Sequence, residues 1–176
     1  MRPGFRITLA APEHLPALAA IERVCADLFD PGDLPLAVRA HTTPLDELDE
    51  ARREGRLWIA LAPDGAPVGF ALAGMLGGEA YLEEIDVHPA HGRQGLGSAL
   101  VREVVGWAAA RAPTLVLTTF GQVSWNGPYY RKLGFRVLAE DELSRELAAQ
   151  LALERLRGLI GRVAMRIDLA LGDVDR

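Results

Sequence analysis

Several features are scarce in this sequence, and each absence narrows what the protein can be. Its 176 residues contain one cysteine, Cys25, which excludes an internal disulfide framework and is typical of a reducing compartment. No apolar run approaches the roughly 20 residues that a membrane-spanning helix needs, and the first residues lack the apolar core of a signal peptide. The net charge of −5 disfavours a nucleic-acid-binding surface. We therefore expect a cytoplasmic protein with no membrane or nucleic-acid partner.

Apolar residues are plentiful, at 49%, which is enough to build a buried core in a chain of this length. No repeat, linker or low-complexity tract divides the sequence, so we expect residues 1–176 to form one domain. One expected helix has a side that should be buried, because apolar residues recur there at helical spacing: Leu18, Ile21, Cys25 and Leu28.

The first half of the chain predicts a helical layer followed by an antiparallel meander. The expected elements are a strand over 5–10, a helix over about 12–29, an irregular Pro-rich segment over 30–43 and a charged helix over 44–55. Three strands should follow over 56–62, 67–76 and 79–88. Asp64-Gly65 and Gly77-Gly78 are turn sequences between these strands, so we expect them to pair antiparallel.

The second half changes pattern. A helix over about 96–111 leads to a short apolar strand over 114–120, and a strand, helix, strand succession predicts a right-handed parallel unit. The remaining expected elements are a short helix near 128–133, a strand over 135–139, a helix over about 141–157 and a strand over 162–169. The fold class is therefore α/β (α+β), with a mixed sheet and helices on both of its faces.

The segment VHPAHGRQGLGSALV, residues 87–101, joins a strand to the helix that begins near residue 96. Glycines at 92, 95 and 97 let the backbone approach a phosphate closely, and the start of a helix offers unpaired N–H groups to an anion. The spacing G-x-x-G-x-G is not the dinucleotide fingerprint, and no Gly-Lys-Ser/Thr of a Walker loop is present. Spacing alone leaves both a plain turn and an anion cradle open.

Charge distribution favours the cradle. No acidic residue lies between Glu103 and Glu140, whereas four basic ones do: Arg111, Arg131, Lys132 and Arg136. A basic region in an acidic protein raises the local concentration of a polyanionic ligand. A chance run of solvated basic residues remains the other interpretation.

These residues carry a family resemblance. VHPAHGRQGLGSALV, followed some 30 residues later by WNGPYYRKLGF, resembles the GNAT superfamily of acyl-CoA-dependent N-acetyltransferases, and the order of elements matches that fold from residue 5 to about 169. The resemblance implies a mostly antiparallel sheet with a β-α-β cofactor-binding unit, and acetyl-CoA as co-substrate in a wedge between the strands 79–88 and 114–120. No metal is implied. The expected cofactor-binding residues are Val87, Gly92, Arg93, Gln94, Gly95, Leu96, Gly97, Ser98 and Asn126.

The sequence departs from the family loop at one place. Gly92 stands where the family usually has Gln or Arg, and Arg93 comes one position later. Because backbone N–H groups do most of the binding, this departure bears on a side-chain contact more than on the cofactor. Asn126 resembles the asparagine that meets the pantetheine arm, but an Asn before Pro128 could equally cap a helix.

Acetyl transfer to an amine sets three chemical demands. An amine of pKa about 10 must lose a proton, the departing thiolate must gain one, and the charge on the thioester oxygen needs a hydrogen-bond donor. The resemblance assigns the acid to Tyr130, from the family pattern Y-x-K-x-G-F in Tyr130-Arg131-Lys132-Leu133-Gly134-Phe135. The family uses main chain as the oxyanion donor, which here is the N–H of Val87.

The base is expected on the strand 79–88, where family members often place one. Strict alternation would put Glu83 on the same face as Tyr81, Ile85 and Val87, among apolar neighbours that raise a carboxyl pKa. Glu83 is therefore the first candidate for the base. Glu84, on the other face, is the second.

Two other chemistries find little support. His88 and His91 are three residues apart, but no third ligand lies nearby in sequence, which disfavours a zinc site. Cys25 has no neighbouring His motif that would make it an acyl-carrying nucleophile. Direct transfer in a ternary complex is the favoured mechanism.

The expected function is thus an N-acetyltransferase that acts on a small-molecule amine. The alternatives are a protein N-terminal or lysine acetyltransferase, a non-catalytic acyl-CoA-binding or sensing domain of the same fold, and a Rossmann-type nucleotide-binding module. The acceptor is expected past residues 28–45, the 57–76 hairpin and the last strand, near four carboxylates suited to a cation: Asp27, Asp30, Asp33 and Asp46. Edge strands could also pair two copies into a homodimer.

Overall fold

The computed structural model describes residues 1–169, so the last seven residues of the expected 1–176 domain lie outside the described part. Seven strands form one sheet in the described chain, in the order β1 (Arg6–Leu9), β2 (Leu57–Leu61), β3 (Pro67–Leu76), β4 (Glu79–Val87), β5 (Thr114–Phe120), β7 (Arg162–Asp168) and β6 (Arg136–Val137). Neighbouring strands pair antiparallel except β4 and β5, which are parallel. The mixed, mostly antiparallel sheet predicted from the sequence is confirmed.

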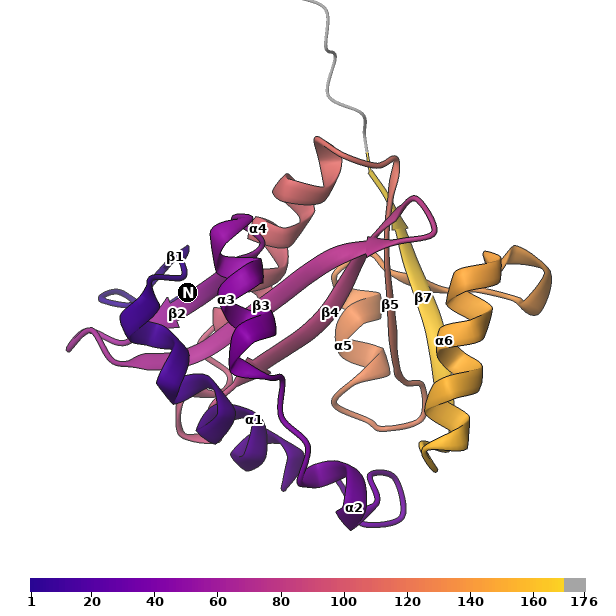
Figure 1. The fold of residues 1–176 in the computed structure, drawn as a ribbon, viewed down its shortest axis with the longest axis horizontal. Helices are drawn as coiled ribbons and strands as arrows, with labels where there is room; N and C mark the ends of the chain where they lie inside the picture. Colours follow the sequence, from indigo (N-terminus) through magenta and orange to yellow (C-terminus); the bar gives the residue numbers. More distant parts are fainter. Residues whose placement is uncertain (170–176) are drawn as a thin grey trace, which may run out of the picture.

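Helices cover both faces of the sheet, as Figure 1 shows. On one face, α4 (Leu96–Ala109) and α5 (Gly127–Lys132) pack on the largest core cluster, which includes Leu82, Leu100 and Leu117. On the other face, α1 (Leu18–Ala26) and α3 (Leu45–Arg53) pack on β2 and β3. Farther along that second face, α6 (Arg145–Leu156) packs on β5 and β7. The crossover from β4 through α4 to β5 is the predicted parallel unit.

The two parallel strands separate soon after they meet. β4 and β5 pair only at Ala80 with Leu115 and at Tyr81 with Val116, although they are 9 and 7 residues long. Beyond these two pairs, the backbone groups of β4 that point toward β5 have no partner in β5, and the same holds for those of β5 that point toward β4. Figure 1 shows the two strands diverging toward the end of β4 that leads into the loop before α4.

A bulge in β4 changes which side chains face which helix layer. Leu72 pairs with Glu84 but the next residue, Ala73, pairs with Leu82, so Glu83 is an extra residue in β4. Before the bulge, Leu82 packs on the α4 face; after it, Ile85 and Val87 do. One inserted residue shifts the alternation of a strand by one position. Glu84 therefore faces the α1 side.

Turns form where the sequence predicted them. The Ala62 N–H donates to Ala66 O (2.9 Å) around the Asp64-Gly65 turn, and Gly65 adopts a φ of +87° that only glycine takes easily. The second turn uses Gly77 and Gly78, both with positive φ. The antiparallel meander β2–β3–β4 is thus confirmed.

Some predicted elements were wrong in type or length. The first turns of the expected helix 12–29 are a 3₁₀ helix, η1 (Pro12–Ala17), because Pro16 inside it has no N–H for an α-helical bond to the backbone O of Pro12. The segment 30–43, expected to be irregular, contains the short helix α2 (Leu36–Arg39). The strand expected over 135–139 is only two residues long.

Two shorter elements complete the description. A 3₁₀ turn, η2 (Pro89–His91), follows β4. The helix expected over 141–157 is split into a 3₁₀ turn, η3 (Glu140–Glu142), and α6, which begins where the Ser144 hydroxyl accepts the Leu147 N–H (3.3 Å).

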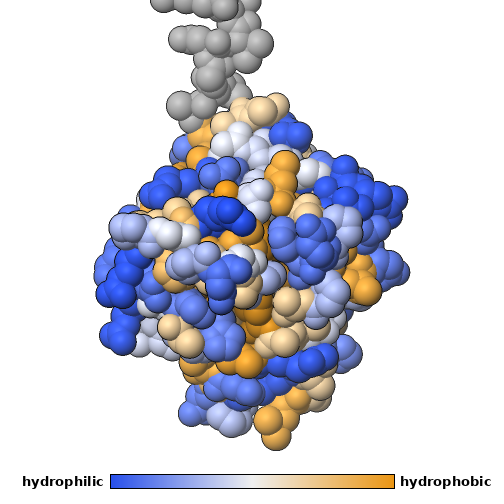
Figure 2. Space-filling view, turned by 90° about the vertical axis from the view of Figure 1, so that its left-hand side faces the viewer, coloured by the Kyte–Doolittle hydropathy of each residue, from blue (hydrophilic) through white to orange (hydrophobic). Residues whose placement is uncertain are grey.

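The surface is mixed in character. Hydrophilic side chains cover most of the face in Figure 2, and apolar ones gather in a strip down its middle and at its lower end. Leu28, predicted to be buried beside Cys25, is 51% exposed, because α1 has ended at Ala26. Within residues 1–169, no helix is both long and apolar enough to cross a membrane.

Candidate active site

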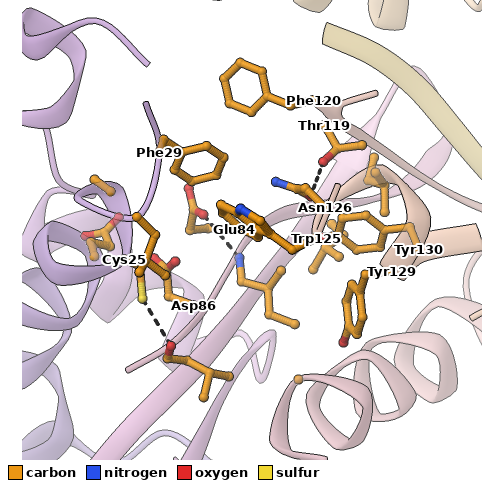
Figure 3. Close-up of a pocket in the computed structure, with 18 of the residues that line it drawn as sticks. Cys25, Phe29, Glu84, Asp86, Thr119, Phe120, Trp125, Asn126, Tyr129 and Tyr130 are labelled. Carbon is orange, nitrogen blue, oxygen red and sulfur yellow. Dashed lines mark hydrogen bonds between the residues drawn. The ribbon is translucent and has the colours of Figure 1, made fainter. Parts of the chain in front are cut away.

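A cavity of about 630 Å³ opens between β4 and β5. Its residues come from five parts of the fold: the loop before α4 with the start of that helix, the strand β4, the segment from α1 to α2, the segment from β5 to α5, and the segment that joins α6 to β7. The cavity therefore fills the gap that the two diverging strands leave, as Figure 3 shows. We call the part lined by residues 91–98 the loop half. The opposite part is the helix half, which is lined by residues 22–39 together with Glu84, Asp86, Phe120, Trp125 and Arg162.

The loop half is built from backbone at the start of α4. The first intrahelical bond runs from Ala99 N to Gly95 O (3.1 Å), so the N–H groups of Leu96, Gly97 and Ser98 precede the ladder of the helix. Gly95 reaches this geometry with a φ of +82°, and Arg93 with a φ of +55°. These N–H groups and the helix dipole suit a diphosphate.

The predicted loop residues largely come together. Gly92, Arg93, Gly95, Leu96, Gly97 and Ser98 all line the cavity, whereas Gln94 does not. The backbone O of Gln94 instead accepts the Arg2 N–H (3.2 Å), which holds the first residues of the chain against this loop. Whether the loop binds a phosphate stays a prediction.

Tyr129 narrows the same half of the cavity. A Cβ at Gly97 would lie 2.8 Å from the Tyr129 hydroxyl, so only glycine fits there without a shift of the tyrosine ring. That hydroxyl is buried and has no hydrogen-bond partner among the described residues. A buried hydroxyl without a partner costs about 1–3 kcal/mol, and a polar ligand in the loop half would supply one. The cradle and this orphaned group both fit the phosphate and amide groups of a coenzyme A arm.

Tyr130 lies deeper in the cavity. Its ring packs against Tyr129 (5.2 Å between centroids) and Phe135 (5.8 Å), and it is 8% exposed. Burial raises the pKa of the Tyr130 phenol far above its usual value. The phenol is thus protonated at any physiological pH and can serve only as a proton donor.

The Val87 N–H points toward the gap between the strands. His88, the next residue, donates its N–H to Val68 O on β3 (2.8 Å). Successive N–H groups of a strand point to opposite edges. The Val87 N–H therefore points to the edge that β5 has left, where the cavity lies.

Two carboxylates from β4 face the cavity opposite the tyrosines, and Figure 3 shows both. Burial, together with the nearby Glu22, raises the pKa of Glu84 to about 7. Burial and the neighbouring Glu84 raise the pKa of Asp86 well above its usual value. Sequence reasoning ranked Glu84 second and did not consider Asp86.

The expectation that Glu83 shares a face with Tyr81, Ile85 and Val87 was wrong, because Glu83 is the bulge residue. Its carboxylate lies over Gly74, 3.6 Å from Arg56 Nη1. Burial raises the pKa of Glu83, and Arg56 partly offsets this. Glu83 still lines the edge of the cavity, but a cation outside the cavity engages its carboxylate. Its catalytic role stays a prediction.

Asn126 lines the cavity beside α5. Its Oδ1 accepts the hydroxyl hydrogen of Thr119, and its side chain makes no cap bond to the helix. Of the two roles considered from the sequence, side-chain capping is therefore wrong. The amide N–H₂ of Asn126 stays available to a ligand.

From the sequence, one side of the site was expected near residues 28–45, and part of that segment does line the helix half, but most of the other side chains there were not predicted. The walls of the helix half include Phe29, Phe120 and Trp125, and its acidic groups include Glu22. No short motif joins these residues, because they are up to 103 positions apart in the chain, counted from Glu22 to Trp125. The aspartates predicted to attract a cation do not line the cavity: Asp27, Asp30, Asp33 and Asp46.

Two chemistries that the sequence disfavoured find no support in the geometry. Burial and the nearby Asp86 raise the pKa of the Cys25 thiol, which keeps it from acting as a thiolate. Across the described part of the chain, no three His, Cys, Asp or Glu side chains are grouped so that they could hold a metal ion.

Comparison with known proteins supplies an independent line of evidence. A model of the acetyltransferase (GNAT) family matches residues 20–135. Among solved structures, N-acetylglutamate synthase from Neisseria gonorrhoeae, complexed with coenzyme A and N-acetyl-glutamate, is similar with a TM-score of 0.72 and 18% identity. The similarity covers 97% of this chain but only 36% of that one, so this chain spans about a third of its length.

Two further structures match over nearly their whole length. The PaiA N-acetyltransferase from Thermoplasma acidophilum, in complex with coenzyme A, has a TM-score of 0.68 and 16% identity over 93% of this chain and 98% of that one. The ribosomal-protein-S18-alanine N-acetyltransferase from Escherichia coli has a TM-score of 0.64 and 19% identity over 98% of each. At such identities the likeness to these structures shows the fold alone.

Proposed function

The chain belongs to the GNAT family of acetyltransferases, which use acetyl-CoA as co-substrate, and we propose that it moves the acetyl group onto the primary amine of a small molecule. The observation that carries this proposal is one continuous cavity that offers a site for the co-substrate and a site for the amine. It has a glycine-lined helix start for a diphosphate at one end and half-buried carboxylates for an amine at the other. Between them lie a protonated phenol and a strand N–H that points inward.

In the proposed reaction, the amine nitrogen attacks the thioester carbonyl carbon directly, within a ternary complex. The C–N bond forms as the C–S bond breaks. The N–H of Val87 donates to the thioester oxygen as negative charge develops there. Tyr130 donates its phenolic proton to the departing sulfur. Placement of the hydroxyl matters more than its high pKa, since the proton moves only as the thiolate forms.

Glu84 is the proposed base. A carboxylate with a pKa of about 7 is half ionised at neutral pH and accepts a proton more readily than an ordinary carboxylate does. Glu84 faces the cavity from β4, the same strand that contains Val87. Glu83, the candidate favoured from the sequence, lies against Arg56 and is the second choice.

On the loop side, the N–H groups of Leu96, Gly97 and Ser98 are proposed to hold the diphosphate of acetyl-CoA. The carboxamide of Asn126 is proposed to contact the pantetheine arm. Tyr129, with its buried hydroxyl, is added to the residues expected from the sequence. The loop half is thus assigned to the co-substrate and the helix half to the acceptor.

The first test separates this function from its alternatives. Thermal stabilisation of the protein by coenzyme A should exceed that by NAD or ATP, and free thiol should appear from acetyl-CoA when amines are added. Stabilisation by NAD or ATP alone would favour a nucleotide-binding module. Stabilisation by coenzyme A without thiol release, for amines and peptides alike, would favour a non-catalytic binder. Thiol release only with peptides or protein substrates would favour a protein acetyltransferase.

The second test concerns the acid. Tyr130→Phe should release thiol at least tenfold more slowly with a good acceptor, while the affinity for coenzyme A changes little, because only a proton donor is lost. Tyr129→Phe is the neighbouring control: it should weaken coenzyme A binding, because its hydroxyl faces the loop half, and should keep most of kcat. Full turnover by Tyr130→Phe at every pH would contradict the assignment.

A further inference from the structure

The helix half of the cavity has an aromatic wall, which we define as Phe29, Phe120 and Trp125. The Phe29 ring lies 4.6 Å from that of Trp125 and 5.1 Å from that of Phe120, between centroids. Figure 3 shows the three rings along one side of the cavity. Trp125 is 48% exposed, so about half of this large apolar side chain has no protein cover. Such a wall suits a ligand with a flat apolar body.

The same half has an acidic group, which we define as Glu22, Glu84 and Asp86. All three line the cavity. Their negative charges act on one another, and their burial is costly, since each carboxyl pKa is raised first of all by burial. A cation bound near them would reduce both the repulsion between the carboxylates and the free-energy cost of burying their charge.

The arginines near this group are already engaged. The guanidinium of Arg39 donates to the backbone O of Leu34 (2.9 Å) and of Phe29. That of Arg162 pairs with Glu154 (2.9 Å) and donates to Thr118 O (3.0 Å). Among the described residues of the helix half, these are the two cations that line the cavity. In each guanidinium, Nε and Nη2 are engaged and only Nη1 is left, so neither arginine can bind a carboxylate of the acceptor through two nitrogens.

From this arrangement we propose a class of acceptor, an inference that rests on the proposed function. The acceptor is a cationic amine with an apolar body of about aromatic size and no carboxylate beside the nitrogen. Its ammonium group binds beside Glu84 and Asp86, with Glu22 adding negative charge nearby, and its body packs on Phe29 and Trp125. A cavity of about 630 Å³, shared with the arm of the co-substrate, favours a small molecule over a protein segment.

Four probes that differ mainly in one group test the charge requirement. We would measure binding to the coenzyme A complex by calorimetry for 2-phenylethylamine, 2-phenylethanol, 3-phenylpropionate and phenylalanine. The amine should bind about tenfold or more tighter than the alcohol, and the anion and the zwitterion more weakly still. Propylamine, which keeps the charge and lacks the ring, should bind about fivefold more weakly than 2-phenylethylamine.

Variants of the aromatic wall and of the acidic group make the test specific to these residues. Trp125→Ala should weaken 2-phenylethylamine binding about fivefold and leave propylamine nearly unchanged. The control is Leu156→Ala, which removes an apolar side chain that is 86% exposed and does not line the cavity. Asp86→Asn should reduce the preference for amine over alcohol by a factor of about three to ten.

The outcomes separate this inference from the proposed function. Phenylalanine or 3-phenylpropionate bound as tightly as the amine would overturn the acceptor class, even if thiol is released. A phenylalanyl peptide bound more tightly than 2-phenylethylamine would overturn the small-molecule assignment. If 2-phenylethylamine binds with the expected preference but no amine releases thiol, the acceptor class stands and the proposed reaction is wrong.

Discussion

The two halves of the cavity are built in different ways. The loop half uses backbone from one short segment, where Gly95 and Gly97 shape the start of α4. The helix half uses side chains that come from α1, from the segment before α2, from β4 and from the β5–α5 connection. A site made of backbone is specified by local conformation, whereas a site made of side chains depends on how distant elements pack. The first kind can be found in a sequence as a motif, and the second cannot.

This difference has a functional side. The same backbone cradle suits any acyl-CoA, because N–H groups and a helix dipole recognise phosphate without regard to the rest of the ligand. In the proposed function, specificity for the acceptor then comes from the helix half. Changes in one half should therefore leave the ligand of the other half nearly unaffected, and four predictions test that separation, from the largest expected effect to the smallest.

The largest effect is expected at Glu84, the residue of the helix half that is proposed to take the proton of the reacting amine. Glu84→Gln removes the proposed base and should lower kcat/KM about 300-fold or more, since general base catalysis contributes about 10²- to 10⁴-fold. Glu83→Gln is the matched control, from the neighbouring position, and should cost less than tenfold. Rates of thiol release for both variants decide between them. A larger loss in Glu83→Gln would return the base to the residue favoured from the sequence.

The pH profile gives the same assignment a second readout. Glu84 accepts a proton only when ionised, so kcat/KM should rise with pH through about 7, where its pKa lies. Deprotonation of the amine near pH 10 would add a separate rise at higher pH. The lower rise should be absent in Glu84→Gln. If that variant keeps it, another group titrates there.

The second prediction concerns the wall of the helix half. Glu154 is buried and accepts hydrogen bonds from Arg162 Nε (2.9 Å), Thr118 Oγ1 (2.6 Å) and Gln150 Nε2 (3.0 Å). Arg162→Met leaves the Glu154 charge without its cation and should lower the free energy of unfolding by about 3 kcal/mol. The double variant Glu154→Leu/Arg162→Met should recover most of that loss.

Denaturant unfolding gives the free energy of unfolding of both variants. The affinity for coenzyme A is measured as well, because it shows whether a change in the helix half affects the loop half. At a temperature where Arg162→Met is folded, its affinity for coenzyme A should stay within about twofold of the parent protein. A single variant as stable as the parent would show that this pair contributes nothing. A large loss of coenzyme A affinity would show that the two halves are coupled.

What the sequence could predict follows the same division. The meander β2–β3–β4 and the unit β4–α4–β5 were predictable, because Asp64-Gly65, Gly77-Gly78 and the period of the apolar residues are local signals. The extra residue Glu83 was not predictable. Its effect on alternation depends on pairing with Leu72 and Ala73, which is a tertiary property. The aromatic wall was not predictable either, because its rings come into contact only when the end of α1 packs beside the end of β5.

The third prediction perturbs the loop half alone. Gly97→Ala places a Cβ 2.8 Å from the Tyr129 hydroxyl and should weaken coenzyme A binding about tenfold, as the ring shifts into the loop half. Gly106→Ala, in the same helix with no atom within 4 Å of the added Cβ, is the control and should stabilise the fold by about 0.5–1 kcal/mol. Gly97→Ala/Tyr129→Phe, which lacks the crowding oxygen, should regain part of the affinity. Unchanged affinity in Gly97→Ala would place the ligand elsewhere.

The smallest effect is expected from a contact that holds the helix half together from outside. Glu22 accepts the Thr43 hydroxyl (2.7 Å) and the Thr43 N–H (3.0 and 3.1 Å), which fixes the segment after α2 to α1. Thr43→Val removes only the hydroxyl bond and should cost about 1–2 kcal/mol of stability. It should also raise the KM for the acceptor by a factor of about three, because Glu22 loses one of the groups that orient it toward the cavity. The KM for acetyl-CoA should not change. Thr42→Val is the control, since the Thr42 side chain makes no hydrogen bond within residues 1–169. Steady-state kinetics with both substrates varied give the two KM values. If both KM values rose together in Thr43→Val, the separation of the halves would be contradicted.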